Sequence, residues 1–273
     1  MIKNLKLYIK NLTLILKENI LKIKHYNFIK LIPHYTKHDD VYLVSYPRSG
    51  SNWLSFLIAN ASLKYFKINR EVNFFNIHHL IPDIDSGRDI EKDIYPLNSR
   101  VIKSHSFFNP FYKSVFYLIR HPDDVMISYF KFLSDLGQYK GNISEFIRTK
   151  KFGINAWKKH VESWLSYNNP ALGIIVFRYE DLKKDSSKEI LKAFKYLGYA
   201  LSDADAKFAA EKSSFINMKK MEQEIYTDGR LIVSGFEFVR KGSSNENTDL
   251  LTLKDKEFIR GSVKRIMEKF HYS

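Results

Sequence analysis

The feature that most constrains the fold is a strand, a short loop and a helix in direct succession. The apolar run at 41–45 predicts a buried strand, and the spacing of Trp53, Leu57 and Ala61 predicts a helix over 52–66. The loop between them reads Tyr-Pro-Arg-Ser-Gly-Ser. This order is typical of phosphate-binding loops, because a glycine lets the backbone approach an anion and the first N–H groups of the helix converge on it.

Strand and helix patterns alternate along the rest of the chain. The further predicted elements are strands at 101–103, 115–119 and 173–177 and helices at 123–136, 155–167, 187–197 and 254–270. Strands that alternate with helices indicate a mainly parallel sheet covered by helices on both faces. The chain has 273 residues and neither an internal repeat nor a low-complexity linker, so we expect a single α/β domain over 36–273.

The segment 1–35 is predicted separately, as an amphipathic helical segment with lysines between its apolar positions. It either packs on the domain or lies as a basic helix on an anionic membrane. It has neither the pattern of a secretory signal nor the roughly 18–20 apolar residues of a membrane span. The chain also has no cysteine. These features together predict a cytoplasmic protein.

The chain is strongly basic, with a formal net charge of +14. Such an excess favours an anionic partner, which includes nucleic acid, a membrane surface, an anionic polysaccharide or a phosphorylated nucleotide. A general abundance of lysine explains the same excess without a partner. The lysines are spread along the chain rather than clustered, so we do not expect a nucleic-acid-binding protein.

The loop at 46–53 differs from the P-loop of nucleoside triphosphatases, because it lacks the first glycine and the Gly-Lys pair. It resembles instead the 5′-phosphosulfate loop of sulfotransferases that use 3′-phosphoadenosine 5′-phosphosulfate (PAPS), which reads Y-P-K-S-G-T-T-W in the cytosolic type. Arg48 stands where the cytosolic type has Lys. Many carbohydrate-modifying members of the family also have Arg at this position. The donor-binding residues that the resemblance implies in this loop are Arg48, Ser49, Gly50, Ser51, Asn52 and Trp53.

Further motifs of the same family follow in its order. Residues 101–105 are similar to V-I-K-T-H, which carries the family's catalytic base, and residues 116–129 are similar to its 3′-phosphate motif. Segments 178–182, 213–218 and 238–242 are similar to those that reach the adenine and close over the 3′-phosphate, although 245–247 depart from the usual G-D-W. The implied nucleotide-binding residues in these motifs are Arg120, Ser128, Tyr179, Ser213, Phe215, Met218, Arg240, Lys241 and Gly242.

The predicted catalytic residues are His105, Lys103 and Arg48. His105 follows a strand, at the edge where open α/β sheets bind ligands, and Lys103 points the same way two residues earlier. We expect His105 to take the acceptor's proton, while Lys103 and Arg48 stabilise charge on the sulfonate and the departing phosphate. For Arg120, a salt bridge with Asp123 or Asp124 is the structural alternative. The resemblance implies no metal.

We therefore expect a PAPS-dependent sulfotransferase that works by in-line displacement on a hydroxyl or amine of a small molecule or a glycan. The alternatives are a phosphotransferase on a P-loop-like fold and a non-catalytic basic protein that binds nucleotides or nucleic acid. The acceptor pocket is predicted within 70–100 and 130–152. Its candidate lining is aromatic at Phe74, Phe75, Phe107, Phe108 and Tyr139, or basic at Lys140, Lys150 and Lys151.

Overall fold

The computed structural model describes residues 37–86, 95–166, 172–227 and 250–272. The predictions for residues 1–35, for Arg240, Lys241 and Gly242, and for 245–247 lie outside the described residues. All of the described residues belong to one compact unit, which begins at Lys37.

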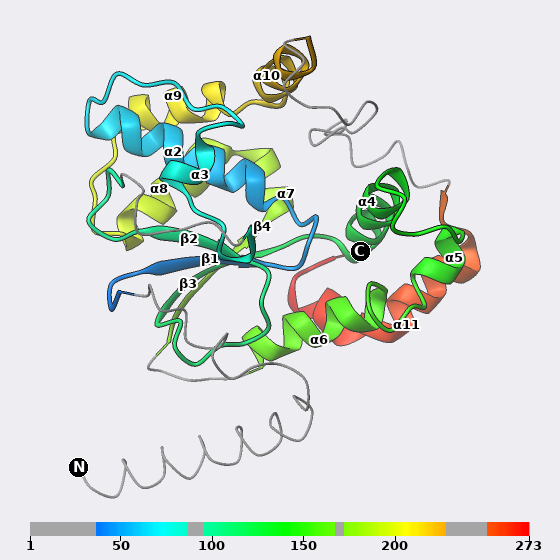
Figure 1. The fold of residues 1–273 in the computed structure, drawn as a ribbon. Coiled ribbons are helices and arrows are strands. Elements are labelled where there is room, and N and C mark those ends of the chain that lie inside the picture. Colours follow the sequence, from blue (N-terminus) through cyan, green and yellow to red (C-terminus); the bar gives the residue numbers. More distant parts are fainter. Residues whose placement is uncertain (1–36, 87–94, 167–171, 228–249, 273) are drawn as a thin grey trace, which may run out of the picture. The chain divides into compact units, whose positions relative to one another are not determined.

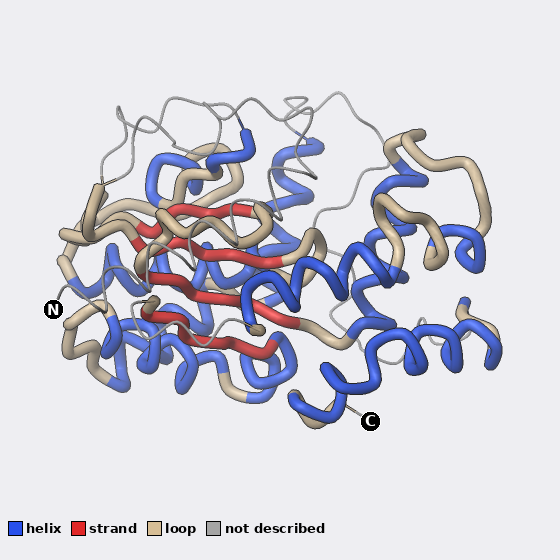
Figure 2. Tube along the Cα trace, turned by 90° about the horizontal axis from the view of Figure 1, so that it is seen from below, coloured by secondary structure: helices blue, strands red, loops and turns tan. Residues whose placement is uncertain are grey.

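A parallel four-stranded sheet forms the centre of this unit, in the order β2-β1-β3-β4 (Figures 1 and 2). The strands are β1 (Val41–Ser45), β2 (Val101–Ser104), β3 (Ser114–Ile119) and β4 (Gly173–Arg178). Each predicted strand is confirmed to within one residue, since short apolar runs between turn residues are the usual mark of strands buried on both faces.

Helices cover both faces of the sheet, which confirms the predicted α/β fold (Figure 1). One core contains alternate β1 residues Val41 and Leu43 and packs against α2 (Ser51–Tyr65), α8 (Ser186–Tyr196) and α9 (Asp203–Lys212). The opposite core contains Tyr42 and Val44 and packs against α4 (Pro122–Asp135), α6 (Ile154–Leu165) and α11 (Leu253–Lys269). The alternation follows from the period of two along a strand.

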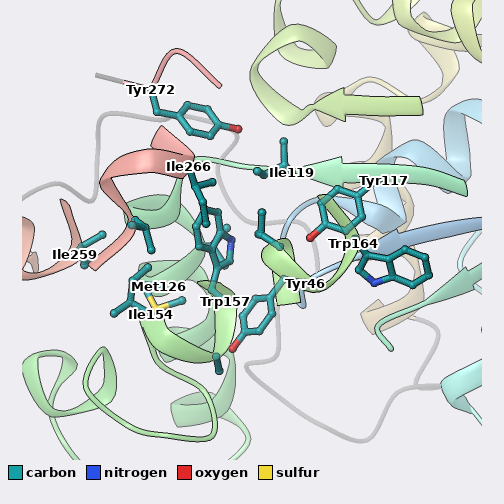
Figure 3. Close-up of a cluster of buried hydrophobic side chains, with 14 of the residues drawn as sticks. Tyr46, Tyr117, Ile119, Met126, Ile154, Trp157, Trp164, Ile259, Ile266 and Tyr272 are labelled. Atoms are coloured by element: carbon teal, nitrogen blue, oxygen red, sulfur yellow. The ribbon is translucent and has the colours of Figure 1, made fainter. Parts of the chain in front are cut away.

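The second of these cores is rich in aromatic side chains, as Figure 3 shows for Tyr46, Tyr117, Trp157 and Trp164. His160 lies in the same core, where its Nδ1 is 3.0 Å from the Tyr117 hydroxyl. Trp164, four residues later on the same face of α6, is buried in this core as well. The Tyr46 hydroxyl donates to the Phe152 carbonyl at 2.8 Å, which anchors the start of the loop after β1 in this core.

Shorter helices complete the unit. They are α3 (Ile77–Leu80), the 3₁₀ helix η2 (Ile84–Ser86), α5 (Ile143–Phe146), α7 (Tyr179–Lys184) and α10 (Phe215–Thr227). Just before η2, Asp83 forms an isolated parallel β-bridge with Lys103. The chain at Asp83 therefore lies beside the edge strand β2. In the ranges that the structure describes, none of the helices combines the length and apolar character needed to cross a membrane.

The strand order places a switch point at β1. The chain passes from β1 to β2 on one side and then crosses to β3 on the other side of β1. In open α/β sheets ligands bind outside the carboxyl ends of the strands at such a point. The loop 46–50 leaves β1 there, and the residues after β2 and β3 lie at the same edge.

Candidate active site

The loop after β1 is shaped by two residues in the left-handed region of backbone conformation. Arg48 has φ 69° and Gly50 has φ 104°. A Cβ at Gly50 would lie 2.6 Å from the Tyr179 ring, so no larger residue fits without displacing that ring. Gly50 caps α2 without a side-chain hydrogen bond, which leaves the first N–H groups of the helix available to an anion.

The Arg48 side chain reaches across to α4. Its Nε donates to the Ser128 hydroxyl at 3.3 Å, and its guanidinium lies 4.6 Å from the centre of the Phe132 ring. Arginine suits this position better than lysine, because a planar guanidinium can donate and stack at the same time. Arg48 and Ser128 come from separate motifs 80 residues apart, and the fold brings them together.

Arg120 lies just after β3 and is held by several weak contacts. Its guanidinium lies 4.2 Å from the centre of the Tyr179 ring, and it donates to the Arg48 carbonyl and to the Asp124 carboxylate, each at 3.4 Å. The alternative of a salt bridge with Asp124 is therefore present, although its geometry is long. Arg120 Nε is buried without a hydrogen-bond partner among the described residues. The side chain is thus placed but not fully satisfied.

Lys103 and His105 lie at the end of β2, each beside an aspartate. Lys103 Nζ is 2.8 Å from Asp83 Oδ2, and the His105 backbone N–H donates to Asp85 Oδ2 at 2.6 Å. The His105 ring lies against β1, with its Nδ1 2.8 Å from the Ser45 carbonyl oxygen. A carbonyl can only accept, so Nδ1 carries the proton of the neutral ring and Nε2 keeps its lone pair.

The electrostatic surroundings of His105 favour this neutral form. Burial, followed by the charge of Lys103, lowers the pKa of His105 below its ordinary value, although Ser45, Asp85 and Asp83 act in the opposite direction. His105 is therefore uncharged at neutral pH, as a general base must be. The buried His160 has a pKa lowered to about 3, so it adds no positive charge near His105 at neutral pH.

A cavity of about 690 Å³ joins these groups. The predicted site residues that line it are Arg48, Gly50, Ser51, Asn52, Trp53, Lys103, His105, Arg120, Ser128, Tyr179, Phe215 and Met218. The fold thus brings together residues from five separate sequence motifs. Trp53 meets Tyr179 edge to face at 5.4 Å between ring centres, and both line the cavity with Phe215, which leaves an aromatic surface on which a flat ring could stack.

Two predicted residues are not in the lining. Ser49 is buried within the loop, and its hydroxyl has no partner among the described residues. Ser213 is also buried and points into the domain, where its hydroxyl accepts from Asn60 of α2 at 3.0 Å. Its neighbour Ser214 lines the cavity instead. The turn before α10 decides which of these two serines faces outward, and a sequence motif does not carry that detail.

Several lining residues were not named individually by the sequence analysis. The main ones are Asp124, Tyr129, Lys131, Phe132, Lys183 and Ser186, of which Lys131 and Phe132 fall within the predicted acceptor range 130–152. Asp124, Ser128 and Phe132 are each four residues apart on α4, so helical spacing from Ser128 could have identified both neighbours. Asp83 and Asp85 were also missed, because nothing in the sequence indicates that their loop lies against β2.

The predicted acceptor residues are mostly elsewhere. Phe74 lines the cavity, whereas Phe75 and Phe107 are exposed, and Tyr139 packs edge to face against Phe146. Phe108 packs on the core, and neither it nor Lys140, Lys150 and Lys151 contribute to the lining. Among the described residues no three His, Asp or Glu side chains are grouped so as to hold a metal ion.

Comparison with known proteins points to one family. The family model described as "Sulfotransferase domain" matches residues 38–271. Rat sulfotransferase 2A2 is 29% identical over 235 residues, with 81% of each chain covered, and rabbit amine sulfotransferase is 27% identical, with 81% of this chain and 78% of the rabbit protein covered. The solved structure of mouse sulfotransferase SULT7A1 complexed with PAP has a TM-score of 0.61 at 22% identity and covers 85% of this chain and 84% of its own.

Proposed function

The chain belongs to the sulfotransferase domain family, and from that premise we propose that it transfers a sulfonate group from PAPS to an acceptor hydroxyl or amine in the cavity at the carboxyl ends of β1, β2 and β3. The product of the donor is adenosine 3′,5′-bisphosphate (PAP). One observation carries the proposal. A single cavity contains the neutral His105 and two groups of cations, Arg48 with Lys103 at one end and Arg120 at the other, which suit the two phosphates of the donor.

The residues of the cavity fit the donor. The N-terminus of α2 with Arg48 and Lys103 suits the 5′-phosphosulfate, while Arg120 and Ser128 suit the 3′-phosphate, and Trp53, Tyr179 and Phe215 suit the adenine. Two buried polar atoms of lining residues, Trp53 Nε1 and Arg120 Nε, have no hydrogen-bond partner among the described residues. An unsatisfied buried group costs about 1–3 kcal/mol, so a ligand that supplies acceptors is favoured.

The reaction follows from the state of His105. Its Nε2 takes the proton of the acceptor hydroxyl or amine as the acceptor atom bonds to sulfur, and the bond between sulfur and the 5′-phosphate oxygen breaks. PAP leaves with the electron pair of that bond. Arg48, Lys103 and the first N–H groups of α2 stabilise the charge that grows on the departing oxygen.

For the acceptor we propose an apolar small molecule that packs against aromatic side chains. The cavity wall beyond the phosphate loop contains Phe74, Tyr129 and Phe132, and such surfaces bind apolar rings. A glycan fits this aromatic wall less well. Lys140, Lys150 and Lys151, which would suit an anionic glycan, are absent from the lining, although Lys131 and Lys183 contribute to it. We also propose that the protein acts in the cytoplasm, where the cytosolic-type relatives that it resembles work.

A phosphotransferase is the rival on this architecture. It needs a P-loop lysine and a carboxylate that holds Mg²⁺ beside the transferred phosphate. Position 50 is followed by Ser51 rather than Lys, and the carboxylate in the cavity lining, Asp124, lies beside Arg120. These features favour the sulfotransferase.

The test is ligand-induced stabilisation, because a ligand that binds the native state raises the melting temperature by mass action. PAP is expected to raise the melting temperature clearly more than ATP with Mg²⁺ at the same concentration. Adenosine 3′-phosphate and adenosine 5′-phosphate, each with one of the two phosphates, are the matched controls and should give smaller shifts than PAP. Equal shifts for PAP and ATP would contradict the donor assignment.

A further inference from the structure

The Lys103 ammonium can interact with two anions, the proposed donor and a nearby aspartate. Lys103 lines the donor cavity, yet its ammonium is 2.8 Å from the Asp83 carboxylate. Asp83 is not in the cavity lining, so the ion pair joins the Lys103 ammonium to a group outside the cavity. The side chains of Lys103 and Asp83 are only 14% and 26% exposed, which makes this pair less screened than a surface ion pair.

The carboxylate is itself fixed by the backbone. Asp83 Oδ1 accepts from the Asp85 N–H at 3.0 Å, which leaves Oδ2 directed at Lys103. The same short segment is tied to edge strand β2, because the Lys103 N–H donates to the Pro82 carbonyl at 2.7 Å. Asp83 therefore stands at a set position, whereas Lys103 is a long flexible chain that can turn to another anion.

We propose that Asp83 is an internal counter-ion that holds the Lys103 ammonium in the free protein and gives it up to the donor's 5′-phosphate when the nucleotide binds. This exchange rests on the proposed function. Asp83 then competes with the donor for one cation, so it weakens nucleotide binding and keeps the cation in place at the wall before the donor arrives. No covalent bond is made or broken in the exchange.

The competition makes a prediction that a structural role does not. Asp83→Asn keeps an oxygen that can accept from the Asp85 N–H but removes the charge that holds Lys103. PAP should therefore bind about three- to ten-fold more tightly to Asp83→Asn than to the wild type, a gain of up to about 1.4 kcal/mol. A residue that merely supports the fold would weaken binding when it is changed.

Three controls separate the exchange from a general charge effect. Adenosine 3′-phosphate, which lacks the 5′-phosphate, should bind the wild type and Asp83→Asn equally. In a Lys103→Met background, Asp83→Asn should no longer change the affinity for PAP, because the two effects couple through the ion pair. The Asp85 carboxylate is a neighbouring charge that accepts from the His105 backbone N–H. Asp85→Asn removes this charge and should tighten PAP binding much less than Asp83→Asn.

The experiment is calorimetric titration of PAP and adenosine 3′-phosphate into the full chain and these variants, with thermal unfolding as the check on folding. If Asp83→Asn does not fold, Asp83→Ser, which also keeps an oxygen acceptor, carries the same test. Tighter PAP binding that depends on Lys103 supports the proposal. Unchanged or weaker PAP binding to a folded Asp83 variant overturns it, and so does an equal gain for Asp85→Asn. Failure of the wild type to bind PAP would overturn the donor assignment as well, which distinguishes the two failures.

Discussion

The two cation-bearing ends of the cavity are built differently. At one end Lys103 is held by a single short ion pair from a loop beside the edge strand. At the other end Arg120 is held by the Tyr179 ring of α7, the Arg48 carbonyl in the loop after β1 and the more distant Asp124 carboxylate of α4. The first arrangement lets one charge move between partners, and the second fixes a planar group in one orientation. This difference is consistent with the proposed roles, in which Lys103 acts at the reacting sulfonate and Arg120 binds the 3′-phosphate of the nucleotide.

The largest expected effect is at the chemical end. His105→Ala should lower the rate of sulfonate transfer by about 10²–10⁴-fold, because the general base is lost. Its affinity for PAP should stay close to that of the wild type, since the proposed function assigns both phosphates and the adenine to other residues. Turnover and calorimetry on the same preparation measure both quantities. A variant that transfers at the wild-type rate would show that His105 is not the base.

The pH dependence of the rate tests the same residue. The pKa of His105 is lowered by burial and by Lys103, so the base stays unprotonated as the pH falls past its ordinary value of about 6.5. The acidic limb of the kcat/KM profile should therefore lie below that pH. An acidic limb above it would contradict the described surroundings of His105.

The phosphate loop between the two ends should be the next most sensitive place. Gly50→Ala requires a left-handed backbone from a residue with a Cβ and places that Cβ 2.6 Å from Tyr179. We expect PAP affinity to fall by about ten-fold or more, because relief of a strain of about 1–2 kcal/mol and of the contact with Tyr179 would displace the loop from the proposed phosphate site. Gly137→Ala is the matched control, because that glycine also has a positive φ but nothing lies within 4 Å of its Cβ position. Equal losses of PAP affinity in the two variants would argue against a specific role for Gly50.

At the gripping end, Arg120→Ala should weaken PAP binding by about ten-fold or more, because a charge-assisted hydrogen bond contributes about 1.5–3 kcal/mol. The rate at saturating donor should change much less, since the 3′-phosphate is remote from sulfur. Binding of adenosine 5′-phosphate, which lacks the 3′-phosphate, should be nearly unaffected. Arg265→Ala, at an exposed position of α11, is the control for loss of an arginine charge. If PAP affinity is unchanged, Arg120 is a structural residue.

The smallest expected effect is far from both ends. Asp255 lies in the first turn of α11, where it forms a capping box with Thr252, and its carboxylate accepts from Ser144, Arg148 and Thr252. Burial would raise its pKa, but these hydrogen bonds outweigh that effect and lower the pKa to about 2. A carboxylate with a depressed pKa in the folded state stabilises the protein above its unfolded pKa, and this contribution is lost as the pH falls from about 4 towards 2.

Asp255→Asn should therefore lower the melting temperature at neutral pH and flatten its dependence on pH in that acid range. PAP affinity should not change. Thermal unfolding at several pH values measures the first effect, and a melting temperature equal to that of the wild type at neutral pH would show that the contacts of Asp255 contribute nothing to stability.

Much of the fold was accessible from the sequence for a physical reason. Strands β1 and β3 are buried on both faces, so their residues form continuous apolar runs, and the loop after β1 needs a glycine at position 50. The position of Asp83 was not accessible in this way. It depends on a loop that lies beside β2 through one backbone hydrogen bond and one isolated bridge, and neither contact leaves a pattern in the sequence. Ser213 failed to reach the cavity for a similar reason, because the phase of one turn selects Ser214.

The most direct test of sulfonate transfer follows the atom that moves. PAPS labelled at sulfur and ATP labelled at the γ-phosphate, with Mg²⁺, are supplied together with a pool of small-molecule acceptors, and the label on the acceptors is then measured. We expect that sulfur label appears on an acceptor, that PAP is released in equal amount, and that neither occurs at a comparable rate with His105→Ala. Phosphate label on an acceptor, with the sulfur label retained in PAPS, would contradict the assignment of sulfonate transfer to this cavity.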